Sequence, residues 1–366
     1  RNLAVFFRSF RPVHRPEDVW YIIPDQFLLG GRQSELESRI KRSLDALAST
    51  NIPFSVLRQY ELPALANATP KAVLFPLPYI LDDAEVTLLA DYARRGGMLY
   101  LSGDATYDQA RQPSRPQVLE TLCGATIATR RYPDIRREGA PVPAFADQPD
   151  LRYDAYPSLE LAGQGGILVR HPLGQGQVLF LNDPIELHAE TATLAKVYQH
   201  LLGLPALPAA PGVLAYRLPT LDGELRLWLN EGNEPASLNL DVPASLAFTI
   251  SPKSQVAAHI AANGAVTAMA TDGAGRQLVL SLDGQGIDRA EALLVLPLGE
   301  GELTLARDLP VLVGEIVDAR WRTYETLPSS RNLPIGELRS TAFLLLCPAD
   351  QRERWTKAVE TLVTHP

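Results

Sequence analysis

Four carboxylates are the residues of this chain whose positions first suggest chemistry. Each lies just after a short apolar run of the kind that forms a buried strand. They are Asp25, Asp104, Asp183 and Glu186. In open α/β sheets the carboxyl ends of the strands meet at one edge, where ligands bind. Two carboxylates about 5 to 9 Å apart across a sugar could hydrolyse a glycoside. The sequence singles out no pair, however, and carboxylates in such positions also cap helices.

His188 is the histidine whose neighbours best suit acid–base catalysis. It stands two residues after Glu186, near the start of a predicted helix and near the same sheet edge. Histidine is the commonest general base because its pKa lies near neutrality. The alternative is a capping cluster, in which Asp183 accepts backbone N–H bonds at the helix start and His188 lies on a polar face. The sequence leaves both interpretations open, and Asn182 belongs to the same turn in either.

Nucleophile and cofactor motifs are weak throughout the chain. Ser102 stands on the tight turn Ser102-Gly103-Asp104, but outside the GxSxG pattern that marks a serine nucleophile. Cys123 and Cys347 lack the spacing of a zinc site or a redox pair and are typical of small buried hydrophobes. The glycines at 30 and 31 lack the spacing of a nucleotide-binding loop. We therefore assign no catalytic residue and no metal ligand, and we expect no cofactor.

Residues 72–104 predict the unit that would position these side chains. The apolar run at 72–75 is typical of a strand covered on both faces. A helix should follow, beginning at Asp82 or Asp83 and ending at Gly96-Gly97. A second apolar run at 98–101 completes a βαβ crossover, which joins parallel strands. Further strands are expected at 19–23 and 54–57, a β-hairpin at 166–181, and helices at 34–48 and 186–202.

These patterns predict an α/β fold, a doubly wound parallel sheet of the flavodoxin-like kind. Its carboxyl edge should gather the strand ends at Pro24, Pro76 and Ser102 and the turn at 182–188. The N-terminal ends of the following helices are positive and favour anions and hydroxyl groups there. We predict a ligand edge made of Asp25, Gln26, Tyr79, Ser102, Gly103, Asp104, Asn182, Asp183, Glu186 and His188.

The hydrophobic period changes from 3.6 to 2 at residue 213. Short alternating strands broken by Asp-Gly and Asn-Gly turns, with no helices between them, predict an antiparallel β-sandwich. Residues 350–363 form an amphipathic pattern, which predicts a final helix. We expect a tail or remnant of an upstream domain at 1–18, an α/β domain at 19–204, a proline-rich linker at 205–212, a β-sandwich at 213–348 and a C-terminal helix at 349–366.

The composition and charge of the chain limit the kinds of molecule that we expect it to bind. The 366 residues carry a net charge of −8 without long charged blocks, which argues against a nucleic-acid partner. No apolar run is long enough to cross a membrane and no signal segment opens the chain, so we expect a cytoplasmic protein with no membrane partner. The chain begins at Arg1, and its methionines stand at 98 and 269. We therefore expect an upstream piece of the same gene product.

The stretch 72–104 also resembles a known domain. Its apolar strand, its Pro78-Tyr79 pair, its acidic helix start and its Tyr92-x-x-x-Gly96-Gly97 pattern resemble the middle domain of family 42 glycoside hydrolases. That domain is the β-galactosidase trimerisation domain, a relative of the class I glutamine amidotransferase fold. The strand at 227–230 and the one after it resemble the last domain of the same enzymes. The resemblance implies this order of domains, with a catalytic TIM barrel upstream in the same gene product.

The resemblance also implies a function. An amidotransferase would carry a cysteine on the turn after 98–101 and a His-x-Glu pair, whereas this chain has no cysteine there and reads Glu-x-His at 186–188. The two catalytic glutamates of family 42 would lie on the upstream barrel. The resemblance thus implies a non-catalytic accessory region that assembles a homo-oligomer, a trimer in the family, and completes or shields the barrel's active site, with carbohydrate as a ligand and the irregular segment 130–157 as an interface. The alternative is a free-standing amidotransferase-like hydrolase, or a carbohydrate-binding protein, with a degenerate site.

Overall fold

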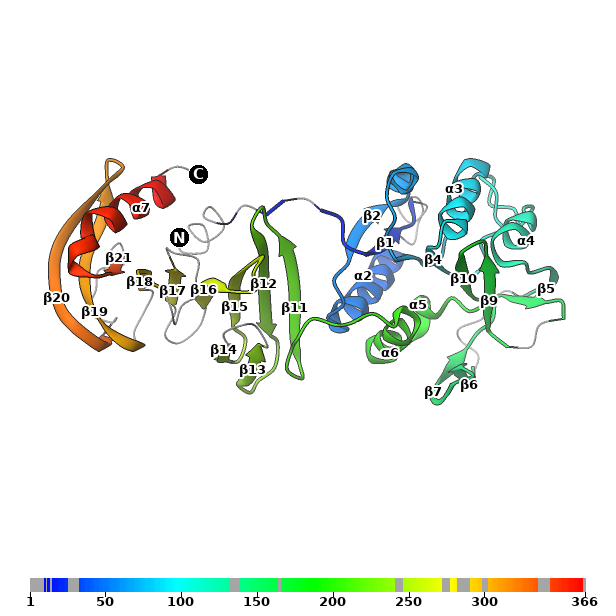
Figure 1. Ribbon diagram of the computed structural model, residues 1–366. Coiled ribbons are helices and arrows are strands. Elements are labelled where there is room, and N and C mark those ends of the chain that lie inside the picture. The colour runs from blue at the N-terminus through cyan, green and yellow to red at the C-terminus, as the bar shows by residue number, and fades with distance from the viewer. Residues whose placement is uncertain are drawn as a thin grey trace. The chain divides into compact units, whose positions relative to one another are not determined.

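The chain folds into two compact units. The computed structural model describes residues 10, 12–13, 15–25, 33–131, 139–163, 166–240, 246–271, 277–281, 290–297, 302–334 and 343–364 (Figure 1). Residues Pro16–Ala206 form one unit, called the α/β unit below. Residues Arg1–Arg15 and Leu207–Pro366 form the other, called the β unit. The N-terminal segment therefore groups with the second half of the chain rather than with the helices and strands that follow it in sequence.

A parallel sheet forms the centre of the α/β unit, as the sequence predicts. Among the described residues it has six strands in the order β2-β1-β3-β4-β10-β9. Neighbours are parallel from β2 to β10, and only β9 runs antiparallel to its neighbour. The strands are β1 (Val19–Ile23), β2 (Ser55–Arg58), β3 (Ala72–Phe75), β4 (Met98–Ser102), β9 (Leu168–Leu173) and β10 (Gly176–Leu181). The β9–β10 pair confirms the predicted hairpin.

Helices cover both faces of this sheet (Figure 1). Val73 and Phe75 of β3 pack in one apolar cluster, while Ala72 and Leu74 pack in another, because alternate side chains of a strand point to opposite faces. The first cluster includes residues of α3 (Asp83–Arg94), α4 (Gln117–Cys123) and the 3-10 helix η2 (Gln59–Ala66). The second includes residues of α2 (Gln33–Ser49), α5 (Ile185–His188) and α6 (Thr191–Leu202).

Contacts within the βαβ unit at 72–104 explain how its sequence pattern fixes the two ends of α3. Asp82 accepts a 2.7 Å hydrogen bond from the backbone N of Glu85, whose carboxylate accepts one of 2.8 Å in return, so a capping box starts α3. At the other end, Tyr92 lies against Gly97, where an added Cβ would come within 2.2 Å of the ring. The Tyr92 hydroxyl donates to the carbonyls of Pro70 and Met98. The Tyr-x-x-x-Gly-Gly pattern therefore fastens the end of α3 to the strand that follows.

Two regions of the α/β unit differ from the sequence-based expectation. The expected helix at 186–202 is interrupted, because Ala189 and Glu190 adopt extended backbone conformations between α5 and α6. The segment 130–157 is more regular than expected in its described part, where β6 (Ala140–Phe145) and β7 (Gln148–Ala155) form a hairpin. A second pair, β5 (Ile127–Arg130) and β8 (Leu159–Leu161), flanks this insertion.

The β unit is built on one large antiparallel sheet. In the part of it that the structure describes, nine strands follow the order β11-β12-β15-β16-β17-β18-β21-β19-β20. They are β11 (Val213–Pro219), β12 (Gly223–Asn230), β15 (Gln255–Ala261), β16 (Val266–Thr271), β17 (Gln277–Ser281), β18 (Leu293–Pro297), β21 (Phe343–Leu346), β19 (Glu302–Val317) and β20 (Arg320–Pro334). A separate pair, β13 (Ala236–Leu240) and β14 (Leu246–Ile250), lies outside the large sheet.

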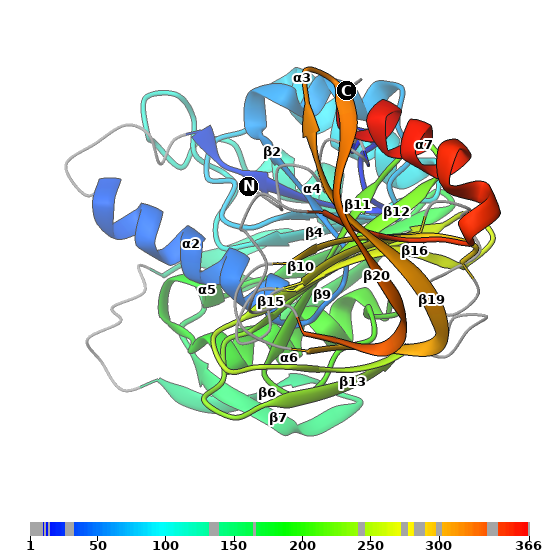
Figure 2. The ribbon, with the colours of Figure 1, turned by 90° about the vertical axis from the view of Figure 1, so that its left-hand side faces the viewer.

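The antiparallel strands agree with the sequence, but their division into two stacked sheets is not confirmed. After the short turn η3 (Ala349–Gln351), the helix α7 (Arg352–Thr364) packs Trp355 and Val359 into the same apolar cluster as Leu294 and Leu345 of the large sheet. Figure 2 shows α7 running beside the long strands β19 and β20. Alternating hydrophobicity shows that a strand has one buried face, but it does not show whether a sheet or a helix covers that face.

The N-terminal segment extends the edge of the large sheet. Pro12 forms a β-bridge with Thr220, and the backbone N of Val13 donates a 2.8 Å hydrogen bond to Pro219. Phe10 stacks on His259 of β15, with the ring centroids 4.0 Å apart. Within the expected tail at 1–18, Phe10, Pro12 and Val13 thus contact the β unit, whereas residues 16–18 belong to the α/β unit.

Candidate functional site at the carboxyl edge of the parallel sheet

The parallel strands bring the predicted ligand edge together. Leu181 at the end of β10 pairs with Ser102 at the end of β4, and the backbone N of Gly103 donates to Leu181. The turns after β1, β3, β4 and β10 therefore meet at one edge, as the topology requires. The structure describes every predicted residue of this edge except Gln26, which lies outside the described residues.

Glu186 is a fully buried carboxylate of the edge, as is Asp183. Its side chain is completely enclosed and accepts three hydrogen bonds from hydroxyl groups. Tyr100 and Tyr198 donate to Oε1 at 2.8 and 3.0 Å, and Ser102 donates to Oε2 at 2.6 Å. Burial raises the pKa of Glu186, although the three hydroxyl groups oppose that shift.

A chain of hydrogen-bonded hydroxyl groups extends from Glu186 along the face of the sheet that α2, α5 and α6 cover. Ser43 lies 2.7 Å from the hydroxyl of Tyr198 and accepts a 2.7 Å hydrogen bond from Tyr21. Because the Tyr198 proton points to Glu186, the order of donation is Tyr21 to Ser43 to Tyr198 to Glu186. One carboxylate therefore ties together β1, α2, β4, α5 and α6.

Ser102 is a structural link rather than an available nucleophile. Its Oγ donates to Glu186 and accepts a 3.1 Å hydrogen bond from the backbone N of Leu77, and its side chain is fully buried. Gly103 follows with a φ of +75°, the left-handed region that glycine adopts without steric cost. Ser102 at the end of β4 thus connects the loop after β3 to α5.

Asp183 and His188 form a buried pair that differs from the predicted helix cap. The N-cap of α5 is Pro184, and no side chain caps that end. Asp183 accepts a 2.9 Å hydrogen bond from the backbone N of Tyr156 and lies 3.0 Å from Nε2 of His188. The imidazole packs edge-on against the Tyr156 ring, at 4.8 Å between centroids. Asp183 therefore holds the insertion and orients His188, which the sequence could not show.

Asp104 and Asn182 also bond to nearby groups of the protein. Asp104 accepts from the backbone N and the hydroxyl of Thr106 at 3.0 and 2.5 Å, and Arg130 lies 3.7 Å from its Oδ2. Burial raises the pKa of Asp104, and the two hydrogen bonds from Thr106 and, to a smaller extent, the charge of Arg130 oppose that shift. The Asn182 side chain accepts from the backbone N of Leu159 at 2.9 Å and donates to its carbonyl. Asn182 thus acts as an extra strand partner for β8.

Asp25 and Tyr79 occupy the remaining part of the edge. Asp25 accepts a 3.1 Å hydrogen bond from the backbone N of Tyr60, and its own N donates to Gln59. The ring of Tyr79 packs edge-on against Tyr107, and burial raises the pKa of the Tyr79 hydroxyl. The prediction that this edge binds a ligand stays a prediction, since each of its carboxylates already accepts hydrogen bonds from the protein itself.

The sequence missed the hydroxyl groups that surround Glu186. Tyr21 and Tyr100 stand inside apolar strands, and Tyr198 stands on the inner face of α6. A buried tyrosine hydroxyl needs a hydrogen-bonding partner, so a tyrosine within an apolar run is a signal for a buried polar group elsewhere in the chain. The signal does not identify that partner, because the carboxylate lies 86 residues from Tyr100.

Neither a metal centre nor a membrane helix is found in the described part of the chain. No group of three or more His, Cys, Asp or Glu residues there could hold a metal ion. No helix among the same residues is long and apolar enough to cross a membrane. Burial raises the pKa of the Cys123 thiol, which disfavours the reactive thiolate.

Comparison with solved structures identifies the fold. A family 42 β-galactosidase from G. stearothermophilus superposes with a TM-score of 0.52 at 13% identity, covering 66% of this chain and 40% of that enzyme. The chain has the fold of part of a family 42 β-galactosidase. The β-galactosidase of the Antarctic haloarchaeon Halorubrum lacusprofundi is similar at a TM-score of 0.50 and 17% identity, with 70% of this chain and 41% of that one covered. No family model matches the sequence, and no curated protein does.

The family 42-like fold covers only part of each enzyme. This chain spans about 40% of the length of the family 42 β-galactosidases that it matches. At 13% and 17% identity, the likeness concerns the fold and carries no residue-by-residue assignment of function.

Proposed function

We propose that this chain is a non-catalytic accessory region of a β-galactosidase-like glycoside hydrolase, whose catalytic TIM barrel belongs to the same gene product. The observation that carries the proposal is the partial match, in which the chain accounts for 40% of a family 42 enzyme. In this proposal the α/β unit corresponds to the amidotransferase-like trimerisation domain and the β unit to the last, sandwich-type domain.

The state of the buried carboxylates supports a structural role. Glycoside hydrolysis needs an acid and a second carboxylate that both reach the sugar. The side chains of Asp183 and Glu186 are both fully buried, and Glu186 is surrounded by three hydroxyl donors. Exposing Glu186 to a substrate would leave those donors unpaired, which is unfavourable. The network therefore suits a scaffold that holds its shape while another part of the protein performs the chemistry.

We further propose that the α/β unit assembles a homo-oligomer, a trimer if it follows the trimerisation domain that it resembles. The β6–β7 hairpin projects from the sheet as a well-formed element and offers exposed surface on its outer side. Light scattering on the chain at rising concentration is the test. A strict monomer at every concentration, together with a monomer when the barrel is present, would contradict this part of the proposal.

Assays with nitrophenyl glycosides test the absence of catalysis. We expect no turnover of nitrophenyl β-galactoside by this chain, and the same null result for the Asp104→Ala and Glu186→Gln variants. Turnover by the unmodified chain that disappears in either variant would overturn the proposal, because it would place a catalytic carboxylate at the sheet edge. Circular dichroism of each variant controls for loss of folding.

A further inference from the structure

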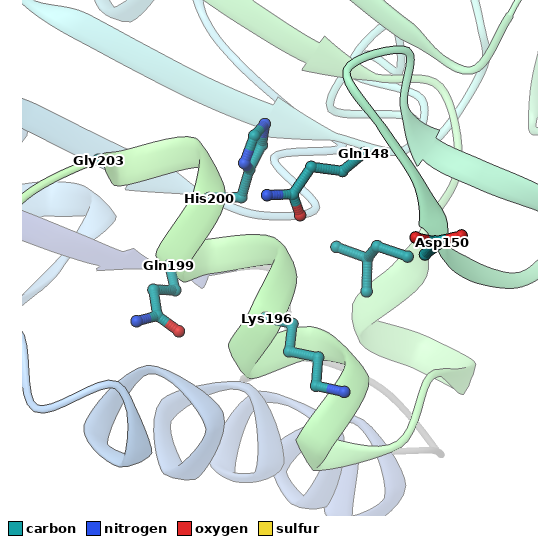
Figure 3. Close-up of a pocket in the computed structure, with 7 residues that line it drawn as sticks. Gln148, Asp150, Lys196, Gln199, His200 and Gly203 are labelled. Carbon is teal, nitrogen blue, oxygen red and sulfur yellow. The ribbon is translucent and has the colours of Figure 1, made fainter.

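A groove on the α/β unit lies apart from the carboxylates of the sheet edge. It runs between the β6–β7 hairpin and α6 and has a volume of about 550 Å³ (Figure 3). Small-molecule sites typically measure about 300 to 1,000 Å³. The hairpin contributes Gln148, Asp150 and Leu151, and the helix and its end contribute Lys196, Gln199, His200 and Gly203.

The walls of the groove are held by buried contacts. Phe145 and Tyr153 of the hairpin belong to the same apolar cluster as Leu194 and Leu201 of α6. His200 is fixed from two sides, since its Nε2 lies 3.3 Å from Asp147 and its ring lies 4.2 Å from that of Phe145. The groove therefore keeps its form without a ligand, which lowers the entropic cost of binding.

Four polar side chains of the groove, unlike His200, have no partner among the described residues. Gln148, Asp150, Lys196 and Gln199 form no side-chain hydrogen bond or ion pair with any other described residue. The chain's other four lysines, all described, each bond to a carboxylate or a carbonyl: they are Lys41, Lys71, Lys253 and Lys357. Lys196 and Asp150 thus line the groove as solvent-exposed side chains that bond to no other described residue.

We propose that this groove binds a neutral saccharide. Lys196 supplies donors, Asp150 supplies acceptors, and the amides of Gln148 and Gln199 supply both, which matches the paired donor and acceptor character of sugar hydroxyl groups. Asp147 and Asp150 disfavour an anion, and Lys196 disfavours a cation. Leu151 offers an apolar surface for the C–H face of the ring. The inference does not depend on the upstream barrel or on the accessory role.

Saturation-transfer NMR with lactose tests the proposal on the full chain. Because the groove is open to solvent, we expect a dissociation constant in the millimolar range. Asp150→Ala and Lys196→Ala should each weaken lactose binding about fivefold, the effect of losing one hydrogen bond. The matched controls are Asp45→Ala and Lys41→Ala, an exposed pair joined at 2.6 Å on α2, and these should leave the affinity unchanged.

Three results would overturn the proposal. The first is the absence of saturation transfer to lactose in the unmodified chain. The second is equal binding by the groove variants and the control variants, which would place the sugar elsewhere. The third is tighter binding of galacturonate than of lactose, which would assign the groove to anions. Glycosidase turnover does not enter this test, so its outcome is distinct from that of the accessory role.

Discussion

Ser102 at the end of β4 donates a 2.6 Å hydrogen bond to Glu186 on α5, across 84 residues of sequence. Both side chains are completely buried. The bond places the hydroxyl that could have served as a nucleophile against the carboxylate that could have served as an acid. Each satisfies the other, so the relationship stabilises the edge of the sheet and leaves neither group available to a substrate.

Glu186 should make stability depend on pH. Its folded-state pKa is raised by burial above the ordinary value of 4.5, so the folded state holds the proton more tightly than the unfolded state. The stability that this residue contributes is therefore full below about pH 4.5 and is lost as the pH rises through the folded-state pKa. Glu186→Gln should remove that dependence. Guanidinium unfolding of both proteins from about pH 4 to about pH 8 measures it, and parallel stability curves would contradict the expectation.

Removing the Glu186 carboxylate altogether should be more damaging than neutralising it. Glu186→Ala leaves the hydroxyl groups of Tyr100, Ser102 and Tyr198 without their acceptor and should lower the free energy of unfolding by about 3 kcal/mol or more. Glu61→Ala, at an exposed carboxylate of η2, is the control and should change it by about 1 kcal/mol or less. Equal losses would show that the buried network adds no stability.

His259 should make the stability of the β unit depend on pH. Burial lowers its pKa below 6.5, although Asp222 at 3.2 Å opposes the shift. The folded state therefore binds the proton less readily, and stability present above pH 6.5 is lost as the pH falls through the folded-state pKa. The protection factors of the β12 and β15 amides, which correct for the pH dependence of intrinsic exchange, should fall on acidification in the unmodified chain and fall less in His259→Gln. An identical fall in both proteins would assign the effect to another group.

Phe10 should stabilise the β unit through its stack on the same histidine. Phe10→Ala removes the 4.0 Å ring contact and should cost about 1 kcal/mol in the stability of this unit. Exchange of β11 amides should rise, because Pro12 and Val13 next to Phe10 pair with that edge. Unchanged protection of β11 would mean that the bridge holds without the ring.

Gly176 should be intolerant of any side chain. A Cβ there would lie 2.2 Å from the carbonyl oxygen of Gly97 and 2.3 Å from that of Ala93, and a backbone cannot easily move away. Gly176→Ala should therefore cost about 3 kcal/mol, within the range of severe overpacking. Gly203→Ala is the control. Its Cβ would meet open space, so only the strain of the φ of +56° remains, and we expect it to lower the stability by about 1 kcal/mol. Thermal unfolding that ranks the two variants in the reverse order would contradict this account.

Trp355 should anchor α7 to the large sheet. The indole is 3% exposed and packs with Val359 among sheet residues such as Leu345. Trp355→Ala should cost about 3 to 5 kcal/mol, while Lys357→Ala on the exposed side of the helix should have little effect. Limited proteolysis after 350 gives a direct readout, and equal cleavage of both variants would show that the helix is held by other residues.

The sequence by itself determined the local elements of the α/β unit. The apolar runs at 72–75 and 98–101, the acidic residues before α3 and the glycines after it act through neighbours in the chain, so their effect can be predicted without a fold. The parallel topology followed, because a strand, helix and strand in succession leave few other arrangements. The gathering of the loop residues at one edge followed from that topology.

Tertiary structure decided what those edge residues do. A carboxylate after a strand has the same sequence signature whether it caps a helix, binds a ligand or lies buried, and only the positions of Tyr100, Ser102 and Tyr198 made Glu186 a buried acceptor. In the β unit, the period of 2 predicted strands with one buried face, but the covering layer depends on long-range packing, which placed α7 there. A single sequence does not identify which residues far apart in the chain are in contact, so only the structure could show these partners.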